Sequence, residues 1–249
     1  MDLGTLLVIS ALVFIVASLY SSVGHGGASG YLAVLSFFAV APAAMSSTAL
    51  VLNVLVAGVA MFSYHRAGHL SWNLSLPFIT LSIPMAFVGG FLRVSDRTYF
   101  LILAVVLVIA AFRLAISVTR GDPDAAQRKV NWPVSLSVGA GIGLLSGVVG
   151  VGGGIFLSPV MLLMRWADAK KTSAASAFFI VVNSLAGIGG RMAKGGLEFV
   201  DTLPLVVAAF LGGLAGSHFG ANKFSGILLR RLLAVVLVVA SIKLVLGTL

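Results

Sequence analysis

Two glycine-rich runs interrupt long apolar stretches of this chain and are its residues best suited to bind a ligand. They are Gly24-His25-Gly26-Gly27 and Gly150-Val151-Gly152-Gly153-Gly154. Glycine disfavours helix because its backbone has the most freedom to lose, so each run predicts a break in a helix. A helix that starts after such a break presents N–H groups without internal partners and a partial positive charge. We therefore expect the breaks to bind a small anion without a buried lysine.

Hydroxyl and amide side chains accompany both runs. Together with the glycines they form the predicted substrate-binding set: Ser22, Gly24, His25, Gly26, Gly27, Ser47, Asn53, Gly150, Gly152, Gly153, Gly154, Ser173, Ser176 and Asn183. Any single hydroxyl has an alternative role in helix packing or in bonding its own backbone. His25 is either a proton carrier or ligand donor, or a neutral imidazole satisfied by a carbonyl.

The composition indicates the element that must position these residues, a bundle of membrane helices. The 249 residues are 59% hydrophobic and 9% charged, whereas a soluble domain carries roughly 25% charged residues. Ten apolar segments follow one another: 4–22, 30–41, 45–64, 73–93, 98–118, 133–149, 154–166, 171–193, 200–221 and 227–248. The first segment lacks a basic region before it, so we assign it to the mature protein rather than to a signal peptide.

Charge and cysteine content exclude several classes of function. The net charge is +9, but the basic residues lie mostly in short connections, which is typical of cytoplasmic loops and does not indicate nucleic acid binding. There is no cysteine, so disulfides, thiol catalysis and thiolate metal sites are excluded. All seven acidic residues fall near segment ends or in loops. We therefore expect no enzyme, no metal and no cofactor.

The two halves of the chain repeat one another. Gly24, Gly26 and Gly27 precede Gly150, Gly152 and Gly153 by 126 residues, and Asn53 precedes Asn183 by 130. This pattern predicts an N-terminal repeat over 1–118, a hydrophilic linker over 119–132 and a C-terminal repeat over 133–249, within one membrane domain. The expected fold is an all-α integral membrane protein with 8 to 10 hydrophobic segments.

The basic residues also predict the orientation of the repeats. If each break reverses the chain as a helical hairpin, ten basic residues share one side of the membrane and five share the other. By the positive-inside rule, the linker is then cytoplasmic, both termini are outside, and the two repeats are inverted. Arg191 and Lys194 are the exceptions on the outer side, where we expect them to snorkel to the interface, with attraction of anions as the alternative.

The two glycine motifs resemble those of the sulfite exporter TauE/SafE family, also called the toluene-sulfonate uptake permease family. The resemblance covers nearly the whole chain, and the family's Gly-Gly-Gly-x-x-x-x-Pro form is met from Gly152 to Pro159. The first half departs from it with Ala28 and Ala33 at the corresponding positions, and with His25 in place of a small or apolar residue. The resemblance implies transport of small sulfur-containing or organic anions, such as sulfite, sulfonates or sulfoacetate, across the bacterial inner membrane.

The expected function is that of a multi-pass secondary transporter of the bacterial inner membrane. It would bind its anion between the broken half-helices of the two repeats, with alternating access as one repeat rocks against the other. The alternative is an anion channel, or a membrane scaffold whose glycines serve helix packing. The expected partners are a small anionic substrate and the lipid bilayer. Protons are a candidate coupling ion and a homodimer is compatible with the sequence.

Overall fold

The computed structural model describes residues 2–22, 24–115, 128–200, 202–220 and 227–247, and every element of regular secondary structure within them is a helix. The described helices are α1 (Leu3–Ser21), α2 (Ala28–Phe37), α3 (Pro42–Arg66), α4 (Trp72–Phe91), α5 (Asp96–Ala115), α6 (Trp132–Val149), α7 (Gly154–Leu163), α8 (Ala169–Lys194), α9 (Thr202–Gly220) and α10 (Ile227–Leu246). The predicted all-α fold with 8 to 10 hydrophobic segments is confirmed. Most of the predicted linker, residues 119–127, lies outside the described residues.

The distribution of apolar side chains is that of a membrane protein. Five described helices, α1, α3, α4, α6 and α8, are long and apolar enough to cross a bilayer. Large apolar side chains such as Leu3, Leu163 and Leu203 are more than two-thirds exposed, whereas Asn53 and Asn183 are fully buried. Apolar side chains on the surface and amides in the interior are expected for a protein surrounded by lipid, because lipid cannot form hydrogen bonds with a polar side chain.

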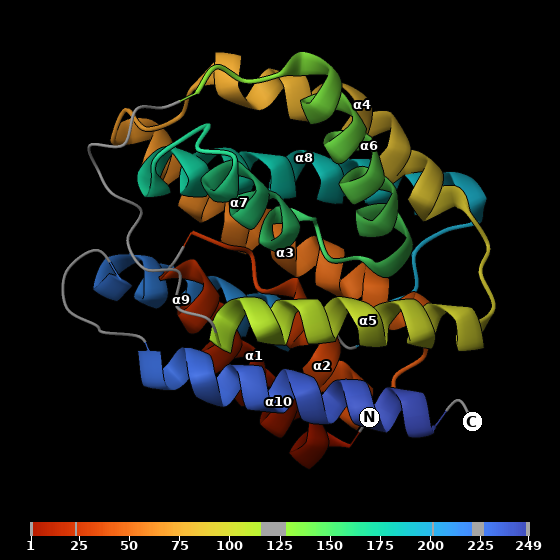
Figure 1. Cartoon of the computed structure of the whole chain (residues 1–249). Coiled ribbons are helices and arrows are strands. Elements are labelled where there is room, and N and C mark those ends of the chain that lie inside the picture. Colours follow the sequence, from red (N-terminus) through yellow and green to blue (C-terminus); the bar gives the residue numbers. More distant parts are fainter. Residues whose placement is uncertain (1, 23, 116–127, 201, 221–226, 248–249) are drawn as a thin grey trace.

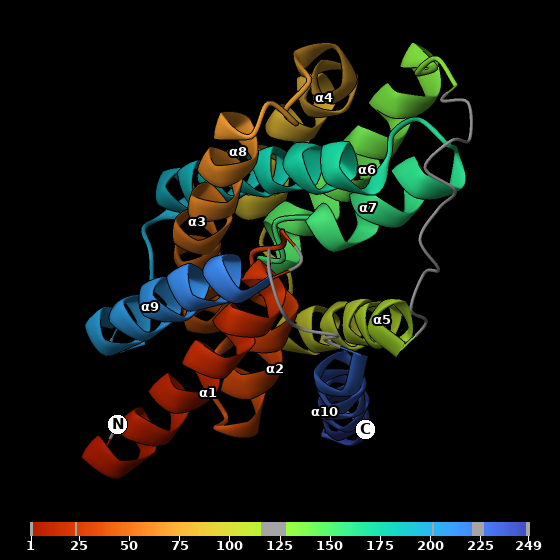
Figure 2. The ribbon, with the colours of Figure 1, turned by 90° about the vertical axis from the view of Figure 1, so that its left-hand side faces the viewer.

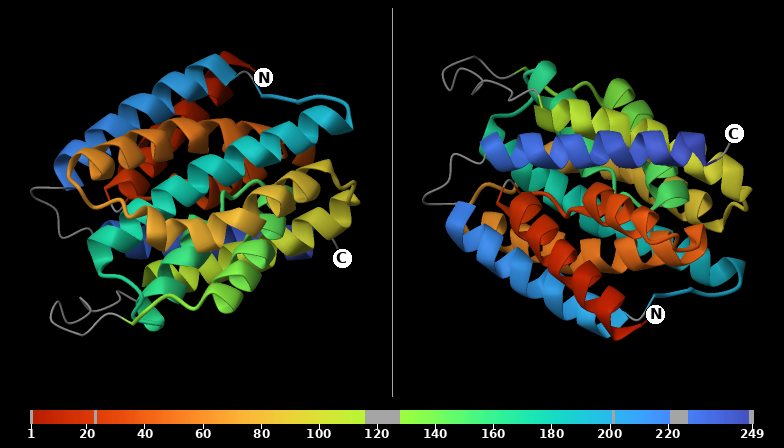
Figure 3. Two further views of the ribbon diagram at one scale, coloured as in Figure 1. Left: turned by 90° about the horizontal axis from the view of Figure 1, so that it is seen from above. Right: turned by 90° about the horizontal axis from the view of Figure 1, so that it is seen from below.

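The helices pack in pairs that join the two halves of the chain. The closely packed pairs are α1 with α9, α4 with α6, α5 with α10 and α3 with α8, together with α4 with α8. Seen from above, α8 lies between α3 and α4, and α9 and α6 lie beyond them on opposite sides (Figure 3). The two predicted repeats are therefore interleaved along the whole bundle (Figure 1). Whether they are inverted across the membrane stays a prediction.

Both glycine runs break the helices where the sequence predicts. α1 ends at Ser21 and α2 begins at Ala28, while α6 ends at Val149 and α7 begins at Gly154. The chain reverses direction at each break, so that α1–α2 and α6–α7 form two hairpins whose tips meet at the centre of the molecule (Figure 2). The shorter arms α2 and α7 have ten residues each, which is too short to span a bilayer.

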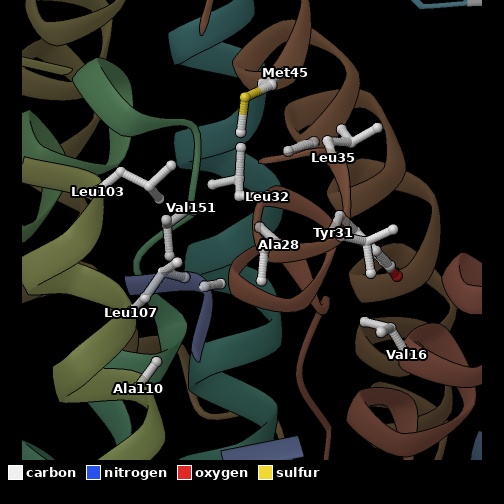
Figure 4. Close-up of a cluster of buried hydrophobic side chains, with 14 of the residues drawn as sticks. Val16, Ala28, Tyr31, Leu32, Leu35, Met45, Leu103, Leu107, Ala110 and Val151 are labelled. Atoms are coloured by element: carbon white, nitrogen blue, oxygen red, sulfur yellow. The ribbon is translucent and has the colours of Figure 1, made fainter. Parts of the chain in front are cut away.

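A hydrophobic core holds the second break against the first half of the chain. Leu32 of α2, Met45 of α3 and Leu103 and Leu107 of α5 are fully buried in one cluster that includes Val151 (Figure 4). The side chain of Val151 lies between those of Leu103, Leu107 and Leu32 (Figure 4). The one non-glycine residue of the second run thus anchors the break by apolar packing.

Candidate functional site

The backbone at both breaks has a conformation that favours glycine. Gly24 and Gly27 have φ angles of 77° and 95°, and Gly150, Gly152 and Gly153 have φ angles of 89°, 76° and 82°. L-residues other than glycine rarely adopt this left-handed region, because their Cβ approaches a carbonyl oxygen. The glycines therefore let the chain turn tightly and enter α2 and α7 directly.

Neither short helix has a side-chain cap at its first turn. The N-cap residue is Gly27 for α2 and Gly153 for α7, and no side chain accepts a hydrogen bond from the helix at either position. The first N–H groups of a helix have no intrahelical acceptor and carry the positive end of its dipole. Both breaks therefore expose donors of the kind that bind an anion.

Asn53 of α3 lies between the two breaks and contacts both. Its Nδ2 donates to the carbonyl of Val151 at 3.0 Å. A Cβ added at Gly26 would collide with Asn53 Oδ1, and one added at Gly152 would lie 2.6 Å from Asn53 Nδ2. The amide is fully buried and its Oδ1 has no hydrogen-bond partner. Gly26 and Gly152 are thus required for the close approach of this amide to both turns.

His25 joins the first break to α7 and α8. Its Nε2 lies 2.8 Å from Ser158 Oγ, which in turn lies 2.9 Å from Ser176 Oγ. The hydroxyl of Ser158 also donates to the carbonyl of Gly154 at 2.9 Å. A serine hydroxyl has one hydrogen, so when Ser158 gives it to Gly154 it accepts from His25, and Nε2 is then the protonated ring nitrogen. The half-buried imidazole is therefore a hydrogen-bonded link between the halves.

Several other predicted residues line the breaks through their backbone or side chains. Gly24 packs against Ser173 and Tyr64, and Gly150 packs against the backbone of Ser46, next to the buried Ser47. Further along the second run, Gly153 lies against Ile142 and Phe179, and Gly154 lies against Ile180 and the backbone of Ser176.

Two predicted polar residues bond their own helices. Ser22 Oγ donates to the carbonyl of Leu19 at 2.7 Å and so closes the end of α1. Asn183 Nδ2 donates to the carbonyl of Phe179 at 2.8 Å, one turn earlier on α8, and its buried Oδ1 has no partner. The two asparagines at matching positions of the repeats are therefore used differently, since only Asn53 donates across to the opposite break.

Ser184 and Ile180 also lie against the glycines of the breaks, although they were not among the residues predicted from the sequence. Ile180 contacts Gly26, Gly152 and Gly154, and the hydroxyl of Ser184 would lie 3.1 Å from a Cβ at Gly152. Ser184 Oγ is buried and has no hydrogen-bond partner. The signal was present in the sequence, because Ser176, Ile180 and Ser184 recur every four residues and so share one face of a helix.

The predicted location of Arg191 was wrong. The residue is 6% exposed, so its side chain is buried within the protein and does not extend along its surface. Instead, Nη2 donates to the carbonyls of Gly147 and Val148 at 2.9 Å each, at the end of α6. Lys194, three residues later, donates to the carbonyl of Leu92 at 3.3 Å. Arg191 is therefore not a surface charge, and it no longer counts among the basic residues from which the topology was predicted.

Comparison with known proteins decides the family. The family model described as "Sulfite exporter TauE/SafE" matches residues 9–244. The chain belongs to the sulfite exporter TauE/SafE family. It is thus a membrane transporter protein rather than an enzyme, and the predicted family is confirmed. A multi-pass protein of the bacterial inner membrane agrees with both the family and the apolar helices.

Curated proteins that are similar in sequence to this TauE/SafE chain are named as probable membrane transporter proteins. A probable membrane transporter protein y4hK of Sinorhizobium fredii is 34% identical over 93% of the chain and 94% of its own length. A probable membrane transporter protein ORF9 of Sinorhizobium sp. is 24% identical over 92% and 88%. A probable membrane transporter protein YunE of Bacillus subtilis is 32% identical over 34% of the chain and 31% of its own length. No solved structure matches the chain.

Proposed function

We propose that this TauE/SafE protein is a secondary transporter of small sulfur-containing or organic anions, such as sulfite, sulfonates and sulfoacetate. The anion binds between the two breaks, where the bare first turns of α2 and α7 supply backbone donors. Half-helices that face each other near the middle of the membrane are a recurring site in secondary transporters. Glycine at these turns lets an anion approach the backbone closely.

The proposed location of the binding site depends on one observation. Ser184 Oγ is buried beside Gly152, at the uncapped start of α7, and has no partner. A buried hydroxyl without a partner is unfavourable by about 1–3 kcal/mol, which an anion accepting its hydrogen would offset. The neighbouring amide of Asn53 fixes the distance between the two turns. Alternating access then requires movement of helices from both repeats, because the repeats are interleaved.

Flux measurements in proteoliposomes test the proposal. With labelled sulfite and labelled sulfoacetate as probes, we expect saturable uptake and counterflow, which are the properties of a carrier. Linear uptake without counterflow would identify a channel instead. The absence of uptake of both probes by correctly folded protein would refute the proposed substrates.

The variant Ser184→Ala tests the site itself. We expect KM to rise about tenfold, because a hydrogen bond to a charged group contributes roughly 1.5–3 kcal/mol, while the melting temperature stays the same or rises. Ser135→Ala is the matched control. Ser135 is also a fully buried helical serine, but its hydroxyl donates to the carbonyl of Asn131 at 2.8 Å. An unchanged KM in Ser184→Ala would remove this hydroxyl from the site.

A further inference from the structure

The second break receives two helix ends of opposite polarity. α7 begins there and directs the positive end of its dipole toward the break, whereas α6 ends there at Val149 and directs its negative end toward it. Each end corresponds to about half an elementary charge. The two ends therefore largely cancel, and an anion at this break gains little from α7 unless the end of α6 is neutralised.

Arg191 and Tyr99 neutralise that end of α6. Arg191 Nη2 donates to the last-turn carbonyls of Gly147 and Val148, and Tyr99 OH donates to the carbonyl of Val149 at 3.1 Å. These are the carbonyls that the helix itself leaves without N–H partners. Within the part of the chain that the structure describes, no carboxylate lies within salt-bridge distance of Arg191. Among these described residues, the partial charges of the helix end are what balances its positive charge.

The guanidinium also retains a donor for a further group. Arg191 Nε is buried and has no hydrogen-bond partner. Arg191 lies two turns after Ser184 on the same face of α8, about 10 Å along the axis. Long helical side chains lean toward the N-terminus, which brings the guanidinium closer to Ser184 and Gly152. An intramembrane charge with no carboxylate partner among the described residues points to function.

Among the described residues, no arginine or lysine donates to the carbonyls at the end of α1. The carbonyls at the end of α1 accept from neutral groups of the turn that follows, from Gly24 N to Ser21 O and from His25 N to Tyr20 O. At the spacing of 130 residues that Asn53 and Asn183 set, the position of Arg191 corresponds to Met61. The two breaks therefore differ in electrostatics although their backbones are alike.

We propose that Arg191 makes the second break the anion-selective half of the binding site. It cancels the negative end of α6, leaves the positive end of α7 effective and adds its own field. Arg191 is thus a specificity-determining residue that acts on the anion through its electric field, from its position at the end of α6. The inference rests on the proposed function, because it requires that an anion binds between the breaks.

The test compares two probes that differ in charge, methanesulfonate with one negative charge and sulfoacetate with two. In proteoliposomes, Arg191→Gln removes the charge but keeps an amide donor for the carbonyls. At about 10 Å and an effective dielectric constant of about 20, we expect KM to rise about 17-fold for the monoanion and about 280-fold for the dianion, because Coulomb energy scales with the product of the charges. Arg191→Lys keeps the charge and is expected to restore most of both values.

Tyr99→Phe is the matched control, since it removes a neutral cap from the same helix end. A purely structural role of Arg191 predicts that both variants lower the melting temperature and change KM equally for the two probes, which would overturn the inference. If Arg191→Gln does not fold, Arg191→Met is the second variant that removes the charge. A larger rise in KM for the dianion than for the monoanion supports a role of the charge, and an equal rise for both probes opposes it. Failure of the wild-type protein to transport either probe would refute the proposed function, and the inference with it.

Discussion

At the scale of single residues, Asn53 is the polar group on which the geometry of both breaks depends. It donates to Val151 in one break and lies against Gly26 in the other. Val151 lies outside any helix, so its carbonyl has no helical N–H donor to replace the amide. Loss of the amide therefore leaves a buried acceptor unsatisfied.

We predict that Asn53→Ala lowers the free energy of unfolding by about 1–3 kcal/mol, as expected when a buried acceptor loses its partner, and reduces transport at least tenfold. Asn183→Ala is the control. Its Nδ2 bonds the carbonyl of Phe179, which lies within α8, where the backbone N–H of residue 183 can still donate to it. Thermal unfolding in detergent and flux in proteoliposomes give the comparison, and equal loss of stability in both variants would contradict it.

The sequence indicated which residues break the helices, but not how their neighbours are used. Glycine runs inside apolar segments act locally, and both breaks were therefore predictable at Gly24–Gly27 and Gly150–Gly154. The contact of Arg191 with Gly147 joins residues 44 positions apart and depends on how α8 crosses α6. A basic residue near the end of an apolar segment looks like an interfacial one, which is why its burial was missed. The proton-coupling role of His25 stays a prediction.

At the scale of helices, glycines at a spacing of four bring α6 into backbone contact with α4. Gly139, Gly143 and Gly147 lie against the carbonyls of Phe78, Ser82 and Ala86, so that any Cβ there would collide with backbone. In lipid, where the hydrophobic effect does not drive association, such close contact supplies van der Waals attraction between helices. In the sequence these packing glycines look like those of the breaks, so this second set was not predicted.

Gly143→Ala and Gly141→Ala form a matched pair on α6. Gly143 faces Ser82, whereas nothing lies within 4 Å of a Cβ at Gly141. We expect Gly143→Ala to lower the free energy of unfolding by about 1–3 kcal/mol through overpacking. Gly141→Ala should leave it unchanged or raise it by up to about 1 kcal/mol, because alanine favours helix. Melting temperatures measured in one detergent test this, and a stable Gly143→Ala protein would mean that α4 and α6 separate easily.

At the scale of the whole molecule, the open question is the orientation of the two repeats in the membrane. The helix pairs are the same when the two halves are exchanged. α1 of the first half packs on α9 of the second half, and α6 of the second half packs on α4 of the first. At the centre, α3 packs on α8. An approximate two-fold relation between the halves would produce this exchange of partners. An axis in the membrane plane would invert the halves, whereas an axis along the membrane normal would make them parallel.

Two connections at matching places in the repeats discriminate between these orientations. Gly68 lies between α3 and α4, Gly196 lies between α8 and α9, and both are exposed with nothing within 4 Å of an added Cβ. Both have positive φ angles, 75° and 116°, so cysteine at either position carries similar backbone strain. The chain has no native cysteine, so each introduced thiol is the only one present.

We predict that Gly68→Cys reacts only with reagents that reach the cytoplasm and that Gly196→Cys reacts with a membrane-impermeant maleimide added outside intact cells. The reason is the positive-inside rule, which puts Arg66 and the linker in the cytoplasm. Ser95→Cys, in the exposed connection between α4 and α5, is the control and should react from outside. Labelling of Gly68→Cys and Gly196→Cys from the same side would make the repeats parallel. The two half-helices would then be related by an axis along the membrane normal and not by inversion.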